Sequence, residues 1–130
     1  MTVRLLLDTH AFLWWLAGHP SMSRRARTTI SAGDAEVFVS AASAWEISTK
    51  YRLGKLPEAS AVAMDILAAI ESQQFQPLAV SVKHGHFAGS LPGTHSDPFD
   101  RMLMAQAMID DLVLVSNERA FDGYGVKRLW

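Results

Sequence analysis

The run Val3-Arg4-Leu5-Leu6-Leu7 ends at Asp8 and gives the first indication of how this chain folds. Its apolar residues follow one another without alternation, which is typical of a strand covered on both faces of a sheet. Strands of this kind belong to parallel sheets that have helices on both sides. Asp8 and Thr9 can cap a helix that follows directly. We therefore predict a buried strand with an acid at its carboxyl end.

Strand-like and helix-like segments alternate along the rest of the chain. Further strands are predicted at residues 37–39, 75–80, 112–115 and 126–129. Pro77 favours an edge position for the second of these. Helices are predicted at residues 9–16, 23–30, 43–54, 59–72 and 81–88, and from Asp97 onward. The alternation predicts an α/β fold, a three-layer α/β/α sandwich, and residues 1–130 are expected to form a single domain.

Composition excludes several classes of function. With 12 Lys and Arg against 13 Asp and Glu, the formal charge is −1, so the chain lacks the bulk positive charge of strongly basic nucleic-acid-binding proteins. The absence of cysteine excludes disulfides, thiolate chemistry and cysteine-based zinc sites. No segment approaches the ~20 apolar residues that a membrane span needs. We expect a cytoplasmic protein with no membrane partner.

Acidic residues gather where predicted strands end and helices begin. Asp8 follows the first strand, Glu46 follows the strand at 37–39, and Glu118 follows the strand at 112–115. Asp97 and Asp100 begin the helix that leads into that last strand. In an open parallel sheet, ligands bind outside the carboxyl ends of the strands. A rim of like charges is tolerable at neutral pH only if protons or cations neutralise it, so the pattern predicts a metal site.

Each of these acids also has a purely structural explanation. Asp97 is a good N-cap ahead of Pro98, and Asp100 interacts well with the helix dipole. Glu46 has capping-box spacing from Ser43, Asp8 can cap the first helix, and Glu118 can be a solvated turn residue. For each acid alone the structural explanation is favoured. The expected convergence of all of them favours the metal site.

Four segments, in chain order, carry a resemblance to a known family: Leu6-Leu7-Asp8-Thr9-His10, Ser43-Ala44-Trp45-Glu46-Ile47, His95-Ser96-Asp97-Pro98-Phe99-Asp100-Arg101 and Val115-Ser116-Asn117-Glu118. The series resembles the PIN domain, in particular the VapC-type toxins of type II toxin–antitoxin systems. The resemblance spans essentially the whole chain. It implies a parallel sheet of about five strands and a metal-dependent endoribonuclease that uses Mg²⁺ or Mn²⁺.

The resemblance also implies roles for individual residues. Asp8 and Asp100 would hold the principal metal with assistance from Asp97, and Glu46 would be a ligand or the general base. Ser116 and Glu118 stand where the family usually has Thr-x-Asp. This departure leaves two roles open for Glu118, which either binds a second metal through water or binds none.

The resemblance implies an RNA substrate and an antitoxin, whereas the homodimer is expected because so small a domain has little groove of its own, and Arg52 and His95 are candidates from their positions in the sequence. The catalytic candidates are thus Asp8, Glu46, Asp97 and Asp100, the metal ligands Asp8, Asp97, Asp100 and Glu118, and the substrate-binding candidates Ser116, Arg52 and His95. The expected partners are RNA, a cognate antitoxin whose tail covers apolar surface, and a second copy in a homodimer. Two alternatives stay open. One is a metal-dependent nuclease or phosphatase acting on other nucleic acids or nucleotides, and the other is a non-catalytic PIN-like binding module whose acids only cap helices.

Overall fold

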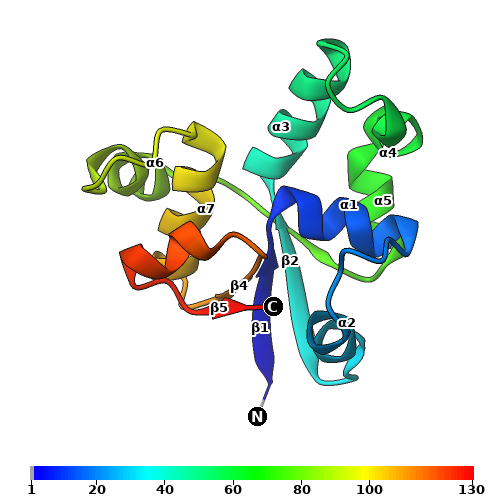
Figure 1. Cartoon of the computed structure of the whole chain (residues 1–130), viewed down its shortest axis with the longest axis horizontal. Helices are drawn as coiled ribbons and strands as arrows, with labels where there is room; N and C mark the ends of the chain where they lie inside the picture. The colour runs from blue at the N-terminus through cyan, green and yellow to red at the C-terminus, as the bar shows by residue number, and fades with distance from the viewer. Residues whose placement is uncertain (1) are drawn as a thin grey trace.

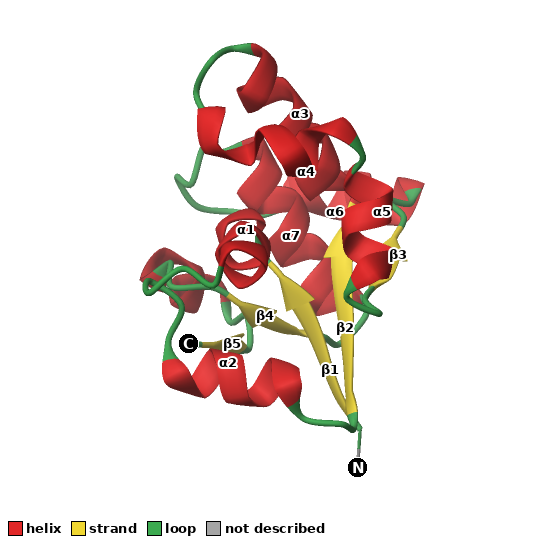
Figure 2. Ribbon diagram, turned by 90° about the vertical axis from the view of Figure 1, so that its right-hand side faces the viewer, coloured by secondary structure: helices red, strands yellow, loops and turns green. Residues whose placement is uncertain are grey.

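A five-stranded parallel sheet between two layers of helices forms the centre of the computed structural model, which describes residues 2–130 (Figures 1 and 2). The strand order is β3-β2-β1-β4-β5. The strands are β1 (Val3–Leu7), β2 (Ala35–Ser40), β3 (Gln76–Leu78), β4 (Val113–Val115) and β5 (Arg128–Leu129). The predicted α/β/α sandwich with about five parallel strands is therefore confirmed, and Pro77 lies on an edge strand as expected.

The first strand is the centre of the sheet. Leu5, Leu6 and Leu7 are fully buried, because β1 pairs with β2 on one side and with β4 on the other. Leu7 is aligned with Val39 of β2 and with Val115 of β4. The carboxyl ends of these three strands consequently meet at one edge of the sheet.

Helices cover both faces of the sheet, and Figure 1 shows α6 and α7 on one side with α1, α4 and α5 on the other. Successive strand side chains point to opposite faces, so Leu5 and Leu7 enter one core and Leu6 enters the other. The first core includes Phe12 of α1, and the second includes Met104 of α7. The helices are α1 (Thr9–Ala17), α2 (Arg24–Ser31), α3 (Ala41–Arg52), α4 (Ser60–Met64), α5 (Ile66–Ser72), α6 (Val82–Ser90) and α7 (Pro98–Ile109), with short 3₁₀ helices η1 (Pro57–Ala59) and η2 (Arg119–Tyr124).

The start of α3 differs from the prediction. The helix begins at Ala41, and its N-cap is Ser40, whose hydroxyl accepts a hydrogen bond from the Ala42 amide. The capping box expected from Ser43 and Glu46 was wrong, because β2 passes into the helix without a loop. Ser43 and Glu46 therefore lie inside α3, where both are buried.

Residues 59–72 also differ from the prediction, since they do not form one helix. The chain turns through η1 and α4 and then breaks at Asp65, whose side chain accepts a hydrogen bond from the Ala68 amide and caps α5. Helical apolar spacing continues across the break, which explains why it was missed. Among the helices within residues 2–130, none combines the length and apolarity needed to cross a membrane.

Candidate metal centre

A small polar cavity of about 130 Å³ lies at the edge of the sheet where β1, β2 and β4 end. It brings together all five acids singled out in the sequence. Lys50 and His10 are the basic residues among those that line it. The lining residues are Asp8, Thr9, His10, Glu46, Lys50, Asp97, Asp100, Asn117 and Glu118.

Asp8 is the most deeply placed of the aspartates, with 8% of its surface exposed. Its Oδ1 accepts a hydrogen bond of 2.7 Å from the Ala11 amide, so it also caps α1 as predicted. Burial raises the pKa of Asp8 to about 6, although hydrogen bonds from Ser116 and Ala11 oppose the shift. The charge of Asp100 adds to the rise. Burial in the fold therefore disfavours the ionised form of this carboxylate.

Glu46 is buried and is held by two donors. The hydroxyl of Thr9 donates to Oε1 at 2.5 Å, and the ammonium group of Lys50 contacts Oε2. Ser43 Oγ lies 3.0 Å from the same Thr9 hydroxyl. Burial lowers the pKa of Lys50, but the hydrogen bond to Glu46 and the charges of Glu46, Asp97 and Asp100 outweigh this effect and raise it. Glu46 therefore has contacts that its predicted capping role does not explain.

Asp97 and Asp100 occupy the first turn of α7. Asp97 Oδ1 accepts hydrogen bonds from the amides of Phe99 and Asp100, at 2.9 and 3.1 Å, so the predicted N-cap is present. Asp100 Oδ2 lies 3.0 Å from His95 Nε2. Burial raises the pKa of Asp100, the His95 contact opposes this, and the charges of Asp97 and Glu46 raise it further. Capping and membership of the acidic cavity therefore coexist at Asp97.

The loop before α7 is fixed by two residues that the sequence did not single out. The Arg101 guanidinium donates to the carbonyls of Ala88 and His95, each at 3.0 Å, and to the carbonyl of Leu91. The Tyr124 hydroxyl accepts a hydrogen bond of 3.2 Å from the His95 amide. These contacts place His95 beside Asp100. The sequence held no signal for them, since they connect side chains to backbone atoms of a loop.

The remaining candidates lie at different distances from the cavity. Ser116 is fully buried, and its hydroxyl is hydrogen-bonded to the Asp8 carboxylate. The same hydroxyl accepts a hydrogen bond of 3.0 Å from the Glu118 amide. Glu118 lines the cavity and caps η2 through a contact of 3.3 Å with the Ala120 amide. Arg52 is exposed at the end of α3 and is absent from the cavity lining. Thr9 and Lys50, which touch Glu46 directly, were not predicted as site residues.

The donor set suits a hard divalent cation. Carboxylate oxygens are the ligands that Mg²⁺ and Mn²⁺ prefer, and five carboxylates line this one cavity. Burial first, and neighbouring acids second, raise the pKa values of Asp8 and Asp100. Within residues 2–130, no three His, Asp or Glu side chains are already arranged as a complete metal site. Coordination of one ion by several of these acids therefore requires side-chain rotation. The chemistry fits, and the ligand geometry is not preformed.

Comparison with known proteins identifies the fold and the family. One similar structure is a chain of VapBC2 from Rickettsia felis, solved in complex with a DNA fragment from the VapBC2 promoter. It is 16% identical with a TM-score of 0.72, and the match covers 98% of each chain. A chain of DNA-bound VapBC from Salmonella typhimurium is 18% identical with a TM-score of 0.69, over 98% of this chain and 97% of that one. VapC20 of Mycobacterium tuberculosis, described as a sarcin–ricin loop cleaving toxin, is 16% identical with a TM-score of 0.60, over 94% and 95% of the two chains.

At these identities the structural matches establish a shared fold. None of the curated protein sequences matches the chain significantly. The profile of the PIN domain matches residues 5–127, almost the entire chain. This protein therefore belongs to the PIN domain family.

Proposed function

We propose that this protein is a Mg²⁺- or Mn²⁺-dependent endoribonuclease and the toxin of a toxin–antitoxin pair. The convergence of Asp8, Glu46, Asp97 and Asp100 in one cavity carries the proposal. Membership of the PIN domain family and the likeness to VapC20 of Mycobacterium tuberculosis, a sarcin–ricin loop cleaving toxin, support it. An acidic cavity repels a phosphodiester unless a cation mediates, which is why the proposal includes a metal ion.

In this proposal Asp8, Asp97 and Asp100 hold the ion, and Glu118 lies at the place of a second one. A bound divalent ion supplies a Lewis acid for the attacking water and for a phosphoryl oxygen. Ser116 is buried against Asp8, so it orients that carboxylate and does not reach the RNA itself. Asp97 fixes the start of α7 through its two amide contacts, which sets the position of Asp100.

Glu46 is the candidate for accepting the proton of the attacking water. Thr9 donates to Oε1 and Lys50 contacts Oε2, so Oε2 becomes the acceptor for this step once the flexible Lys50 side chain moves away. His95 lies 3.0 Å from Asp100, and its side chain is 20% exposed, so it is accessible to the RNA backbone. Arg52 lies beyond the cavity and would contact RNA that extends past α3.

The decisive experiment measures RNA cleavage with Mg²⁺ or Mn²⁺ and with chelator for the wild type, Asp100→Asn and the control Asp111→Asn. Asp111 is an exposed acid in a surface ion pair and has a positive φ of 54°, which asparagine tolerates. We expect Asp100→Asn and chelator each to abolish cleavage and Asp111→Asn to leave it unchanged. Metal-dependent cleavage that survives in folded Asp100→Asn refutes the assignment, and metal-dependent hydrolysis of DNA or nucleotides in place of RNA supports the alternative nuclease or phosphatase.

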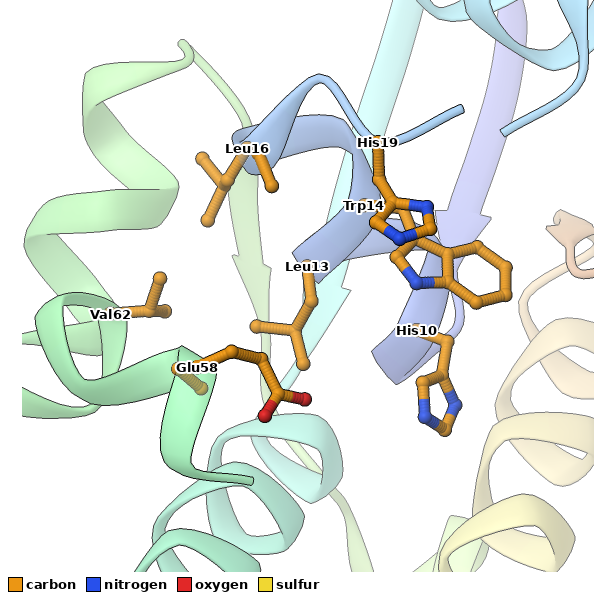
Figure 3. Close-up of a pocket in the computed structure, with 9 residues that line it drawn as sticks. His10, Leu13, Trp14, Leu16, His19, Glu58 and Val62 are labelled. Carbon is orange, nitrogen blue, oxygen red and sulfur yellow. The ribbon is translucent and has the colours of Figure 1, made fainter. Parts of the chain in front are cut away.

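An antitoxin is the second part of the proposal. An apolar pocket of about 520 Å³ lies next to the acidic cavity, between α1 on one side and η1 and α4 on the other (Figure 3). Leu13, Leu16 and Val62 give it a carbon surface, and His10 lines both this pocket and the acidic cavity. A helical or extended antitoxin tail that fills the pocket would reach the acids, where an arginine could pair with them.

A homodimer remains part of the proposal. Trp45 is 66% exposed on α3 and packs edge-on against Phe99 of α7, with ring centroids 5.0 Å apart. Tryptophan is enriched at protein–protein interfaces, so Trp45 is the residue that we propose contacts a second copy. Sedimentation of the wild type and of Trp45→Glu measures this, with dissociation by the variant as the expected result.

A further inference from the structure

Lys50 differs from the other basic residues of this chain in the charges that surround it. We infer that Lys50 is a tethered counter-cation of the acidic cavity, which competes with the divalent ion for the carboxylates and thereby sets the metal affinity. The inference rests on the proposed metal-dependent function. It gives Lys50 a role that an ordinary helix-surface ion pair does not have.

The position of Lys50 is the first observation. Lys50 lies one turn after Glu46 on α3, and its Nζ contacts Glu46 Oε2. The side chain of Lys50 is 30% exposed and that of Glu46 only 5%. The pair thus lies at the mouth of the cavity, with the acid inside it. Charges interact more strongly in such a place than in open solvent.

A second lysine of the chain provides the contrast. Lys127 Nζ lies 2.9 Å from Asp111 Oδ1, with side chains 70% and 79% exposed. Both pairs join a lysine to a carboxylate, but water and salt screen the second one almost completely. A charge effect that is specific to the cavity should therefore appear at Lys50 and be absent at Lys127.

The charge balance of the cavity is the second observation. Lys50 is the one Lys or Arg among the described residues that line it, and it shares the cavity with Asp8, Glu46, Asp97, Asp100 and Glu118. Its ammonium group neutralises part of this charge. A divalent ion bound by the same acids would be repelled by that ammonium group. The flexible four-carbon stem allows Lys50 to withdraw into solvent when the ion binds.

The test compares Mn²⁺ binding by isothermal titration calorimetry in the wild type, Lys50→Met, Lys50→Arg and the matched control Lys127→Met. We expect Lys50→Met to bind Mn²⁺ roughly tenfold more tightly, because a like charge is removed from a poorly screened site. Lys50→Arg and Lys127→Met should bind like the wild type. In chelator, the thermal midpoint of Lys50→Met should fall below that of Lys127→Met, and Mn²⁺ should raise it by more than it raises that of the wild type.

The outcomes separate this inference from the proposed function. Unchanged or weaker Mn²⁺ binding by Lys50→Met overturns the inference, provided that the wild type binds Mn²⁺ and Asp100→Asn does not. A wild type that binds no Mn²⁺ overturns the inference and the proposed metal site together. If Lys50→Met does not fold, Lys50→Gln keeps a hydrogen-bond donor toward Glu46 without the charge and gives the same comparison.

Discussion

The acidic cavity and the apolar pocket lie side by side and share His10, but each destabilises the free protein for a different reason. In the acidic cavity, the buried carboxylates of Asp8 and Glu46 lie beside the half-buried Asp97 and Asp100, and donors such as Thr9 and His95 hold them. In the apolar pocket, Leu13, Leu16 and Val62 leave carbon surface in contact with water. The first region is unfavourable because it concentrates charge, and the second because it exposes apolar surface.

The difference shows how the two regions can be tested separately. Removing charge from the acidic cavity should stabilise the fold while it destroys cleavage. Adding charge to the apolar pocket should leave cleavage intact while it weakens the hold of a partner. A region that contributed only to folding would show neither of these combinations.

The largest effect is expected for Asp8→Asn. Cleavage should fall about a thousandfold or more, as loss of a metal ligand removes several kcal/mol of transition-state stabilisation. In chelator at about pH 7.5, the same variant should be more stable by about 3 kcal/mol, since the pKa of Asp8 is raised from 3.8 to about 6 and each pKa unit by which burial disfavours the carboxylate is worth about 1.4 kcal/mol. Asparagine still caps α1, so the helix is preserved.

The control for this prediction is Asp8→Ala, which removes the charge and the cap together. It should be less stable than Asp8→Asn by about 1 kcal/mol, the usual contribution of an N-cap. Urea unfolding measures both variants. If Asp8→Asn is clearly less stable than the wild type, the hydrogen bonds of Asp8 outweigh its charge, and the contrast between the two regions does not hold.

The pH dependence of stability is the next largest effect. The pKa of Asp8 is raised from 3.8 to about 6 in the folded protein. The folded state therefore binds a proton more tightly than the unfolded state, and the free energy of unfolding should increase as the pH falls through about 6 toward 4. The gain should reach about 3 kcal/mol, and the raised pKa of Asp100 acts in the same direction.

Chelator-containing melts between about pH 8 and pH 4 measure this dependence. The difference between the wild type and Asp8→Asn isolates the contribution of Asp8 and should shrink as the pH falls. The lowered pKa values of Asp111 and Asp122 remove stability only at more acidic pH. A difference that stays constant across this range contradicts the buried, raised carboxylate.

Leu16→Glu tests the other region. Leu16 is partly exposed on α1, so glutamate should be accommodated, and RNA cleavage by the free protein should match the wild type. Inhibition by the antitoxin, taken as the product of the adjacent gene, should require at least roughly tenfold more protein, since a charge would be buried against apolar surface. Met64→Glu is the matched control, because Met64 is 87% exposed on α4 and lies outside the pocket lining. Equal inhibition of Leu16→Glu and Met64→Glu would place the partner elsewhere.

Most residues of the acidic cavity could be predicted from the sequence, because local sequence patterns mark their positions. The leucines of β1 identify a buried strand, and the Asp97-Pro98 pair marks the start of α7. Parallel topology then brings the carboxyl ends together, so Asp8 and Asp100 meet as expected. Capping residues mark the starts of helices, and apolar runs mark buried strands. These are the features that a single sequence shows most directly.

What the sequence could not show depends on contacts between distant residues. The correct start of α3 places Glu46 deeper in the helix, where Thr9 from α1 reaches it. The sequence alone does not place Lys50 at the acidic cavity, because the acids of α7 whose charges act on it are 47 and more residues away in the numbering. The apolar pocket depends on the break at Asp65 and on how α4 is placed against α1, neither of which follows from helical periodicity.

The smallest effect is expected for Tyr124→Phe, which removes one hydrogen bond from the loop that places His95 beside Asp100. The variant loses the hydrogen bond from the His95 amide but keeps the ring beside His95, and a single neutral hydrogen bond contributes about 1 kcal/mol or less. Arg101 still holds the loop through three carbonyls, so cleavage should remain within about threefold of the wild type. Urea unfolding and cleavage rates measure the two effects. A loss of cleavage as large as that of Asp8→Asn would mean that Tyr124, and not Arg101, mainly holds the loop. It would also mean that His95 determines the position of Asp100.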